Sequence, residues 1–238
     1  MRPFAWAFAA SRGASLAERL AGRGVRLSTR RLVAGDEAAF ADPSEPLARR
    51  RASGAARLAA RGALAALGGP ADAALPRAPG GFALWPAGFR GSLAHDQGLA
   101  VAAVARTRDI AALGVDVEPA QALPDEVAEI ALLPAERRAC ARDPALARAI
   151  FAAKEAVYKA INPRDGGAPE YEDIAVDLAA GVAGLGDGRT LGLDFERGAF
   201  AGGERWIVVA YAPPGGRYGR AATGISAPMP ERVGPTAA

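Results

Sequence analysis

The chain of 238 residues is long enough to bury a substantial core, and its content of 50% hydrophobic and 23% charged residues is ordinary for a globular protein. No apolar run approaches the ~20 residues that a membrane-spanning helix needs, and a net charge of only +3 gives no reason to expect a nucleic-acid partner. The single cysteine, Cys140, excludes an internal disulfide framework and a cysteine-rich zinc site. The start of the chain lacks a convincing signal-peptide cleavage site, so we expect a cytoplasmic protein.

The first half of the chain contains one clear helix and one clear strand. Residues 47–67 are rich in alanine and arginine, and their leucines recur near helical spacing. This pattern predicts a helix with a basic face, which the Gly-Gly-Pro sequence at 68–70 ends. After a Trp-Pro-Ala-Gly turn at 85–88, the apolar run at 99–105 predicts a buried strand.

The second half opens with a short strand at 113–119, and two helical patterns follow it. The first pattern covers 124–140 and the second 144–161, where Asn162 and Pro163 are expected to end the helix. Three later segments have strand character and predict an antiparallel sheet, at 171–178, 185–197 and 205–212.

A helical pattern followed by strands occurs twice along the chain, which predicts an α+β protein of two similar halves packed with a cleft between them. We expect the first half to span residues 1–110 and the second half to span 111–220. Residues 221–238 are rich in glycine, proline and alanine, and we expect them to be a disordered tail.

Two acidic residues, Asp116 and Glu118, lie in the strand predicted at 113–119. Because the side chains of a strand alternate between its faces, both carboxylates project to one side while Val115 and Val117 point into the core. An isolated pair of this kind is more often the solvated edge of a sheet than a functional site.

A third acid, Glu155, lies four residues before Lys159 in the helix predicted at 144–161. At about 100° per residue, the two side chains share one side of the helix, away from its apolar stripe. Alone they could equally form a surface ion pair, which stabilises a helix by only ~0.2 to 0.5 kcal/mol. The stripe consists of Leu146, Ile150, Val157 and Ile161.

Together, three carboxylates and a lysine predict a Mg²⁺ ion that bridges a pyrophosphate, because Mg²⁺ prefers oxygen ligands and typically binds substrate phosphates. The only lysines of this arginine-rich chain are Lys154 and Lys159, and an ammonium differs from a guanidinium at a phosphate. Further cations for a phosphate lie in the first half of the chain: Arg49, Arg50, Arg51, Arg57, Arg61, Arg77 and His95.

Two sequence motifs, GVDVE at 114–118 and FAAKEAVYKA at 151–160, resemble the paired signature of the 4'-phosphopantetheinyl transferases. The two-half branch, the enterobactin-synthase and surfactin type, is the most similar. Its basic helix resembles RRRASGAARLAAR at 49–61, and the stretch before its central strand is similar to LWPAGFRGSLAH at 84–95. The resemblance covers roughly residues 49 to 162 and implies the fold and the activity of that family.

By this resemblance, Asp116, Glu118 and Glu155 hold Mg²⁺, or Mn²⁺ in its place, against the pyrophosphate of coenzyme A. Lys159 and Lys154 then face the phosphates of coenzyme A. These residues form the reacting end of the expected site.

The resemblance also implies a nucleotide end. His95, Arg49 and Arg57 would surround the 3'-phosphoadenosine part of coenzyme A. Arg77 and a turn at Gly91–Ser92 would line the nucleotide.

The reaction implied is in-line attack of a carrier-protein serine on the pantetheine-side phosphorus, with release of 3',5'-adenosine diphosphate. Asp116, Lys159 and Glu155 are the expected catalytic residues, and Glu155 would take the serine proton directly or through a water on the metal. The expected partner is a small acidic acyl or peptidyl carrier protein. A chain that holds both halves is expected to be a monomer.

Two alternatives remain at this point. Ala94 stands where relatives carry a hydroxyl residue before the histidine, which would suit a non-catalytic protein that binds coenzyme A as a sensor or assembly partner. A nucleic-acid binder that uses the basic helix is the other alternative, although the chain has no helix-turn-helix or RNP-like signature.

Overall fold

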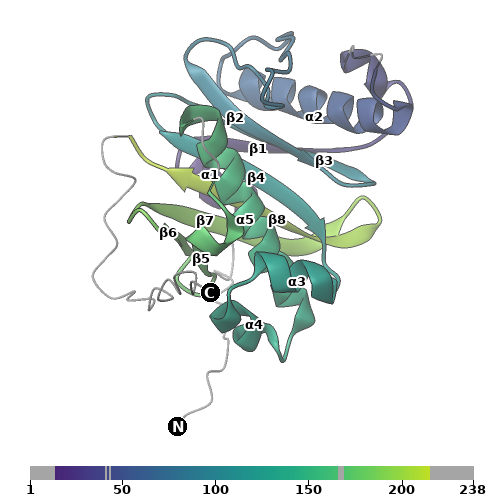
Figure 1. Ribbon diagram of the computed structural model, residues 1–238. Helices are drawn as coiled ribbons and strands as arrows, with labels where there is room; N and C mark the ends of the chain where they lie inside the picture. Colours follow the sequence, from purple (N-terminus) through teal and green to yellow (C-terminus); the bar gives the residue numbers. More distant parts are fainter. Residues whose placement is uncertain (1–13, 41, 43, 166–168, 215–238) are drawn as a thin grey trace, which may run out of the picture.

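The computed structural model describes residues 14–214, except for 41, 43 and 166–168. Two antiparallel sheets form the framework, one of three strands and one of five, and helices pack on them (Figure 1). The expected α+β class is therefore confirmed. The segment 221–238, for which the sequence predicts disorder, lies outside the described residues.

The first sheet comes from the N-terminal part of the chain. Its elements are α1 (Leu16–Ala21), β1 (Val25–Arg31), the 3-10 helix η1 (Asp36–Ala39), α2 (Leu47–Ala66), β2 (Phe89–His95) and β3 (Leu99–Arg106). The strand order is β1-β3-β2. Helix α2 lies across this sheet (Figure 1) and buries alanine and leucine side chains against β3. The helix and the strand predicted in this half are present as α2 and β3.

The second sheet follows without a long connection. Its elements are β4 (Ala112–Pro119), α3 (Asp125–Ala131), α4 (Pro134–Cys140), α5 (Pro144–Asp165), the 3-10 helix η2 (Tyr171–Asp173), β5 (Ile174–Asp177), β6 (Val182–Leu185), β7 (Thr190–Phe200) and β8 (Gly203–Ala212). The strand order is β4-β8-β7-β6-β5, so β4 is an edge strand. The long helix α5 crosses the face of this sheet (Figure 1).

Several elements differ from the sequence predictions, and three of them have a plain physical reason. The helix expected at 124–140 is two helices, because α4 begins at Pro134 and a proline ring clashes with the preceding turn of a continuous helix. Helix α5 does not end at Asn162 and Pro163 but continues to Asp165; a proline disfavours the helical conformation of the residue before it without forbidding it. Strand β1 was not expected, since Val25 is its only buried residue.

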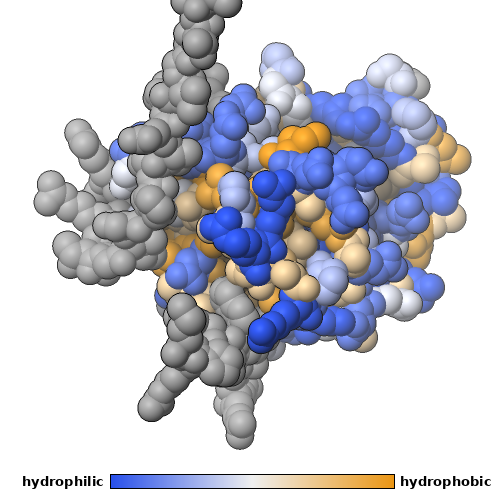
Figure 2. Space-filling view, turned by 60° about the horizontal axis from the view of Figure 1, so that its bottom comes forward, coloured by the Kyte–Doolittle hydropathy of each residue, from blue (hydrophilic) through white to orange (hydrophobic). Residues whose placement is uncertain are grey.

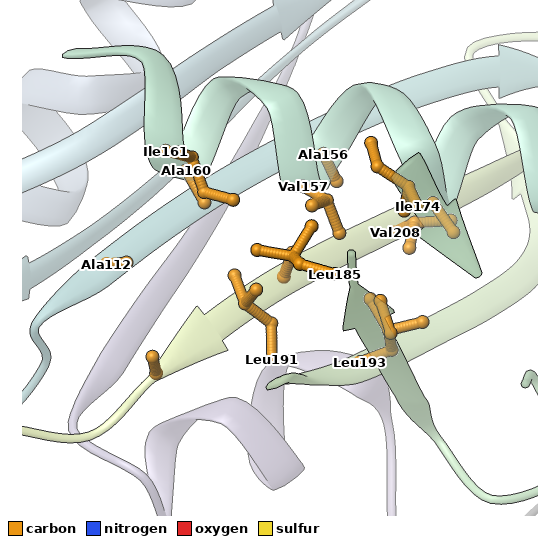
Figure 3. Close-up of a cluster of buried hydrophobic side chains, with 14 of the residues drawn as sticks. Ala112, Ala156, Val157, Ala160, Ile161, Ile174, Leu185, Leu191, Leu193 and Val208 are labelled. Carbon is orange, nitrogen blue, oxygen red and sulfur yellow. The ribbon is translucent and has the colours of Figure 1, made fainter. Parts of the chain in front are cut away.

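Helix α5 packs on the second sheet through small residues. Val157 and Ile161 point from α5 toward Leu185 and Leu191 in the cluster shown in Figure 3. In β4, a Cβ atom on Gly114 would lie only 1.9 Å from the carbonyl oxygen of Ala156. The helix can therefore come this close to the strand only over a residue without a side chain.

The two sheets share one buried core. β3 ends at Arg106 and β4 begins at Ala112, so the chain changes sheets between these residues. The shared cluster combines Val101 and Ala103 of β3 with Val115, Val117, Ile207 and Val209 of the second sheet. At the rim of this core, the carboxylate of Asp96 pairs with the guanidinium of Arg205 across the two sheets, and both side chains are largely buried.

Helix α1 precedes the first sheet in sequence but bonds to the second one. Arg19 and Arg23 pair with the carboxylate of Asp194 in β7 at 3.3 and 2.8 Å. The backbone N–H of Leu16 donates to Glu196 at 2.7 Å. The first residues of the described chain therefore tie the two sheets together.

The outer surface is mixed in character. On the face shown in Figure 2, hydrophilic residues cover much of the described surface and hydrophobic residues lie between them. Among the helices of the described ranges, none combines the length and the apolar character that a membrane crossing requires.

Replacing Gly114 with alanine is expected to lower the free energy of unfolding by about 3 kcal/mol, because the added methyl group would overlap the Ala156 carbonyl and push α5 off β4. Denaturant unfolding followed by circular dichroism measures the loss. Gly184→Ala in β6 is the control, because nothing lies within 4 Å of a Cβ there, and it should change the stability by less than about 1 kcal/mol. Equal losses in the two variants would contradict the close approach of α5 to β4.

Candidate active site

Strand β4 and helix α5 bring the first acid and the lysine together. The alternation expected for β4 is observed: Val115 and Val117 are buried in the core between the sheets, and the carboxylate of Asp116 reaches the ammonium of Lys159 on α5. The distance from Lys159 Nζ to Asp116 Oδ1 is 2.6 Å. The apolar stripe of α5 that the sequence predicts is buried as expected: Leu146, Ile150, Val157 and Ile161.

Asp116 is unusual because the residue is only 5% exposed and one of its two carboxylate oxygens has no partner among the described residues. Its Oδ2 atom is buried and has no hydrogen-bond partner in the described part of the chain. Burial raises the pKa of Asp116, the ammonium of Lys159 opposes this rise, and the charge of Glu155 raises the pKa further. A buried carboxylate oxygen without a partner is costly, so this position favours an additional cation.

Glu118 lies two residues beyond Asp116 in β4 and is half-buried. Its Oε2 atom pairs with the guanidinium of Arg148 on α5 at 3.0 Å. Arg148 also donates to the carbonyl oxygen of Ala122 at 2.9 Å, which fixes the position of the guanidinium. Burial and then the charge of Asp116 raise the pKa of Glu118, while Arg148 opposes the rise.

Glu155 extends from α5 and accepts a hydrogen bond at Oε1 from the hydroxyl of Tyr171 in η2. Burial raises the pKa of the Tyr171 hydroxyl, and the hydrogen bond to Glu155 raises it further, so this hydroxyl remains a neutral donor. Asp116, Glu118 and Glu155 are called the acid cluster below. The pKa shifts show that the charge of Glu155 acts on Asp116 and that the charge of Asp116 acts on Glu118.

The three acids are engaged by protein groups and are not arranged as a metal site. Over the described residues, no group of three or more histidine, cysteine, aspartate or glutamate side chains is placed so that it could hold a metal ion. The unpartnered Oδ2 of Asp116 and the mutual repulsion of the acids are both features that a cation would relieve. Because every available donor is an oxygen, the cluster fits Mg²⁺ better than zinc.

Lys154 does not join this cluster, so the expectation that it faces phosphates is corrected. Its side chain is completely buried, and its ammonium pairs with Glu136 Oε2 at 2.9 Å and donates to the carbonyl oxygen of Tyr171 at 2.9 Å. Glu136 also accepts from the backbone N–H groups of Leu133 and Val176. Burial lowers the pKa of Lys154 and the charge of Glu136 opposes this. Lys154 therefore links α5 to α4 and η2.

Arg57 is likewise committed to the protein, which corrects its expected place at the nucleotide. The residue is 5% exposed. Its guanidinium donates to the carbonyl oxygens of Leu75 and Ser53 at 2.9 and 3.0 Å and stacks 4.1 Å from the centre of the Phe40 ring. Burial lowers the pKa of Arg57 to about 10, and the neighbouring charges of Arg77 and Arg61 contribute. The guanidinium of Arg57 is therefore bonded inside the protein and does not face solvent.

Arg49, Arg77 and His95 are exposed residues of the N-terminal part of the chain. Glu45 bridges the two arginines, with contacts of 3.3 Å to Arg49 and 2.7 Å to Arg77. His95 is exposed, yet the protein around its imidazole lowers its pKa by desolvation, and the charges of Lys159 and Arg49 lower it further. The lowered pKa leaves the His95 imidazole largely neutral at pH 7, and it shows that His95 lies within reach of the charges of Lys159 and Arg49.

The segment Gly91–Ser92 lies within strand β2 and is not the turn that the sequence suggested. Ser92 is buried, and its position in the strand directs its side chain to the face opposite that of His95. The structure therefore does not bring Ser92 and His95 to one face. A Cβ on Gly91 would meet the Ala103 carbonyl and the Trp85 ring, so glycine is required for packing here.

Arg148 and Tyr171 contact the acid cluster but were not anticipated. Arg148 lies seven residues before Glu155 on α5, so the helical period could have placed it on the same side. Tyr171 follows a connection after α5, and no local pattern places it beside Glu155. Beside Tyr171 lies a pocket of about 350 Å³, lined by Glu155, Tyr158, Pro169, Glu170, Tyr171 and Ile174.

Comparisons with known proteins identify relatives over both parts of the chain. Residues 36–105 match the 4'-phosphopantetheinyl transferase N-terminal domain, and residues 112–204 match the 4'-phosphopantetheinyl transferase superfamily. The chain is 40% identical over 184 residues to the 4'-phosphopantetheinyl transferase Svp of Streptomyces mobaraensis, a match that covers 71% of this chain and 74% of Svp. It is 39% identical over 145 residues to Npt of Nocardia iowensis, covering 59% and 65%, and 40% identical over 111 residues to PptT of Mycobacterium tuberculosis, covering 45% and 48%.

Replacing Lys154 with methionine is expected to lower the free energy of unfolding by about 3 to 5 kcal/mol, because the carboxylate of Glu136 would stay buried without its ammonium. Arg197→Met is the control for removing the cation of an ion pair. Both side chains of the Arg197–Glu204 pair are exposed, at 40% and 60%, so its loss should cost clearly less. Denaturant unfolding of both variants checks this order, and a reversed order would contradict the structural role of Lys154.

Proposed function

We propose that this chain, which belongs to the 4'-phosphopantetheinyl transferase family, transfers the 4'-phosphopantetheine group of coenzyme A to a serine of an acyl or peptidyl carrier protein. In this proposal the reaction depends on Mg²⁺ and releases 3',5'-adenosine diphosphate. The observation that supports it most is Asp116, whose buried and unpartnered Oδ2 lies beside Lys159 and within the charge of two further acids.

The acid cluster would hold the metal. Asp116 would offer its free Oδ2 atom, and Glu118 and Glu155 would each offer the carboxylate oxygen opposite the one bonded to Arg148 or Tyr171. Mg²⁺ takes few protein carboxylates together with phosphate oxygens, and Mn²⁺ accepts the same oxygen ligands. The bound ion would neutralise charge that develops on the pyrophosphate.

Lys159 would supply the compact positive charge next to the pyrophosphate. Its ammonium is already held by Asp116, where α5 meets β4. From there His95, Arg49 and Arg77 would accompany the nucleotide end of coenzyme A and its 3'-phosphate. Phosphoryl transfer depends mainly on positioning and charge neutralisation, to which Lys159 and the two arginines would contribute.

The attacking serine hydroxyl must lose a proton, and Glu155 is the proposed acceptor, directly or through a water. A general base has to lie within hydrogen-bond reach of the proton that it takes. Glu155 borders the pocket beside η2 and is less buried than Asp116, so an incoming serine could approach it. No nucleophile of the enzyme is needed for this route.

The partner protein would be a small acidic carrier, with the arginines of the first half favouring its approach. One chain supplies both sheets, so we infer a monomer. We also infer a cytoplasmic enzyme without a membrane or nucleic-acid partner.

The alternative of a non-catalytic sensor depended on Ala94. This residue is 3% exposed in the core between the sheets, so a hydroxyl there would lie away from the side of His95.

Asp116→Asn is expected to reduce the transfer rate by at least about a thousandfold while leaving the fold intact, because it removes a charge from the metal site at constant shape. Incubation with coenzyme A, Mg²⁺ and several apo carrier proteins, followed by mass spectrometry of the carriers, measures the transfer. The thermal transition is the control for folding. A full phosphopantetheine mass gain on the carriers with the Asp116→Asn variant would overturn the assigned site.

Acidification is expected to weaken Mg²⁺ binding before it unfolds the protein. The pKa values of Asp116 and Glu118 are raised, so these acids take up protons at a higher pH than ordinary carboxylates do. The protonated forms attract no cation, and the affinity should fall by about tenfold per pH unit for each acid that titrates. Calorimetric titration of Mg²⁺ into the enzyme saturated with coenzyme A, in buffers from neutral to mildly acidic pH, tests this; a constant affinity would contradict it.

A further inference from the structure

Tyr171 is attached to helix α5 at three points. Its ring packs against the ring of Phe151 with the centroids 6.0 Å apart. Its carbonyl oxygen accepts a hydrogen bond of 2.9 Å from the ammonium of Lys154. Its hydroxyl donates to Oε1 of Glu155. Three residues within two turns of one helix therefore determine where this side chain lies.

The backbone attachment of Tyr171 is itself firmly held. The ammonium of Lys154 is completely buried and pairs with Glu136, whose carboxylate is 7% exposed. Glu136 accepts from the N–H of Leu133 at 2.7 Å and from the N–H of Val176 at 2.9 Å. The network thus joins the start of α4, the middle of α5 and strand β5. It leaves η2, and with it Tyr171, little freedom to move relative to Glu155.

Glu155 is bonded to a neutral hydroxyl, whereas the other two acids of the cluster are bonded to cations. Asp116 and Glu118 are paired with the cations Lys159 and Arg148, which compete with a metal for their charge. A neutral hydroxyl fixes one carboxylate oxygen without neutralising the group. Ordering a glutamate side chain costs rotamer entropy. Because the Tyr171 hydroxyl already orders Glu155, that cost does not arise again when a metal ion binds.

We propose that Tyr171 is a positioning residue for Glu155: its hydroxyl holds Oε1 so that Oε2 is directed to the metal and to the serine proton. This inference depends on the proposed function, because it assigns a supporting residue to the same site. Tyr171 acts through Glu155 and need not touch the reacting atoms. The Glu136–Lys154 pair has a part in this arrangement, since it fixes the backbone from which the tyrosine extends.

The test compares Tyr171→Phe with the wild-type enzyme by calorimetric titration of Mg²⁺ into protein saturated with coenzyme A, without a carrier, so that no turnover occurs. Phenylalanine keeps the ring that contacts Phe151 and lines the pocket, and removes only the hydroxyl. We expect Mg²⁺ affinity to fall by about tenfold or more, the usual effect of losing a group that orients a metal ligand. We also expect kcat to fall while KM for the carrier stays within about twofold.

Tyr211→Phe is the matched control for the general effect of losing a buried tyrosine hydroxyl. The Tyr211 hydroxyl also bonds a carboxylate, that of Asp194, and its ring lies 5.0 Å from the guanidinium carbon of Arg23, away from the acid cluster. This variant should lower the thermal transition and leave Mg²⁺ affinity unchanged. A parallel loss of Mg²⁺ affinity in both variants would show a general effect on stability and overturn the inference.

The remaining outcomes separate this inference from the proposed function. If the wild type binds Mg²⁺ and Tyr171→Phe binds it equally well with the same kcat, Tyr171 is not a positioning residue, and the proposed function stands. If the wild type shows no Mg²⁺ binding in the presence of coenzyme A, the proposed metal site itself is overturned, and the inference with it. Weaker Mg²⁺ binding and lower kcat in Tyr171→Phe alone support both.

Discussion

The close contact between helix α5 and strand β4 is the constraint on which the candidate site depends. It requires Gly114, because any side chain at this position would overlap the backbone of Ala156. With the helix this near, the ammonium of Lys159 reaches the carboxylate of Asp116 within 2.6 Å. A larger separation would break this contact between the strand and the helix. The geometry of the acid cluster therefore follows from packing between small residues, before any charged group contributes.

The second requirement is a fixed relation between the two sheets, since Lys159 lies on the helix of the second sheet and His95 ends strand β2 of the first. Valines of β4 share a core with β3, helix α1 bonds to β7, and Asp96 pairs with Arg205 at the rim. Asp96 directly follows His95, so this largely buried pair anchors the end of β2 close to the second sheet. His95 consequently lies where the charge of Lys159 acts on it. Rigid attachment of the two sheets therefore holds residues that are far apart in sequence in a fixed arrangement.

The sequence was most informative where a local period decides which side a residue takes. Alternation in β4 separates Asp116 from Val115, and the helical wheel separates Glu155 from Val157, so these assignments need no tertiary information. The same periods could not show what covers the other sides of α5 and α2. Lys154 and Arg57 are charged and look solvent-facing in sequence, yet Glu136 of α4 covers the first and backbone carbonyls receive the second. Tyr171 reaches Glu155 only through the path of the chain after α5, which no period encodes.

The two lysines illustrate how one compositional signal can have two physical causes. Both stand in α5 of a chain that otherwise uses arginine, and the sequence suggested a common role at a phosphate. Lys159 is partly exposed beside Asp116, where a compact charge can approach a phosphate. Lys154 is fully buried between a carboxylate and a carbonyl oxygen, a space that suits an ammonium with few donors better than a planar guanidinium with five. In the proposed function Lys159 would therefore serve the site through its charge, whereas Lys154 fixes the segment that carries Tyr171.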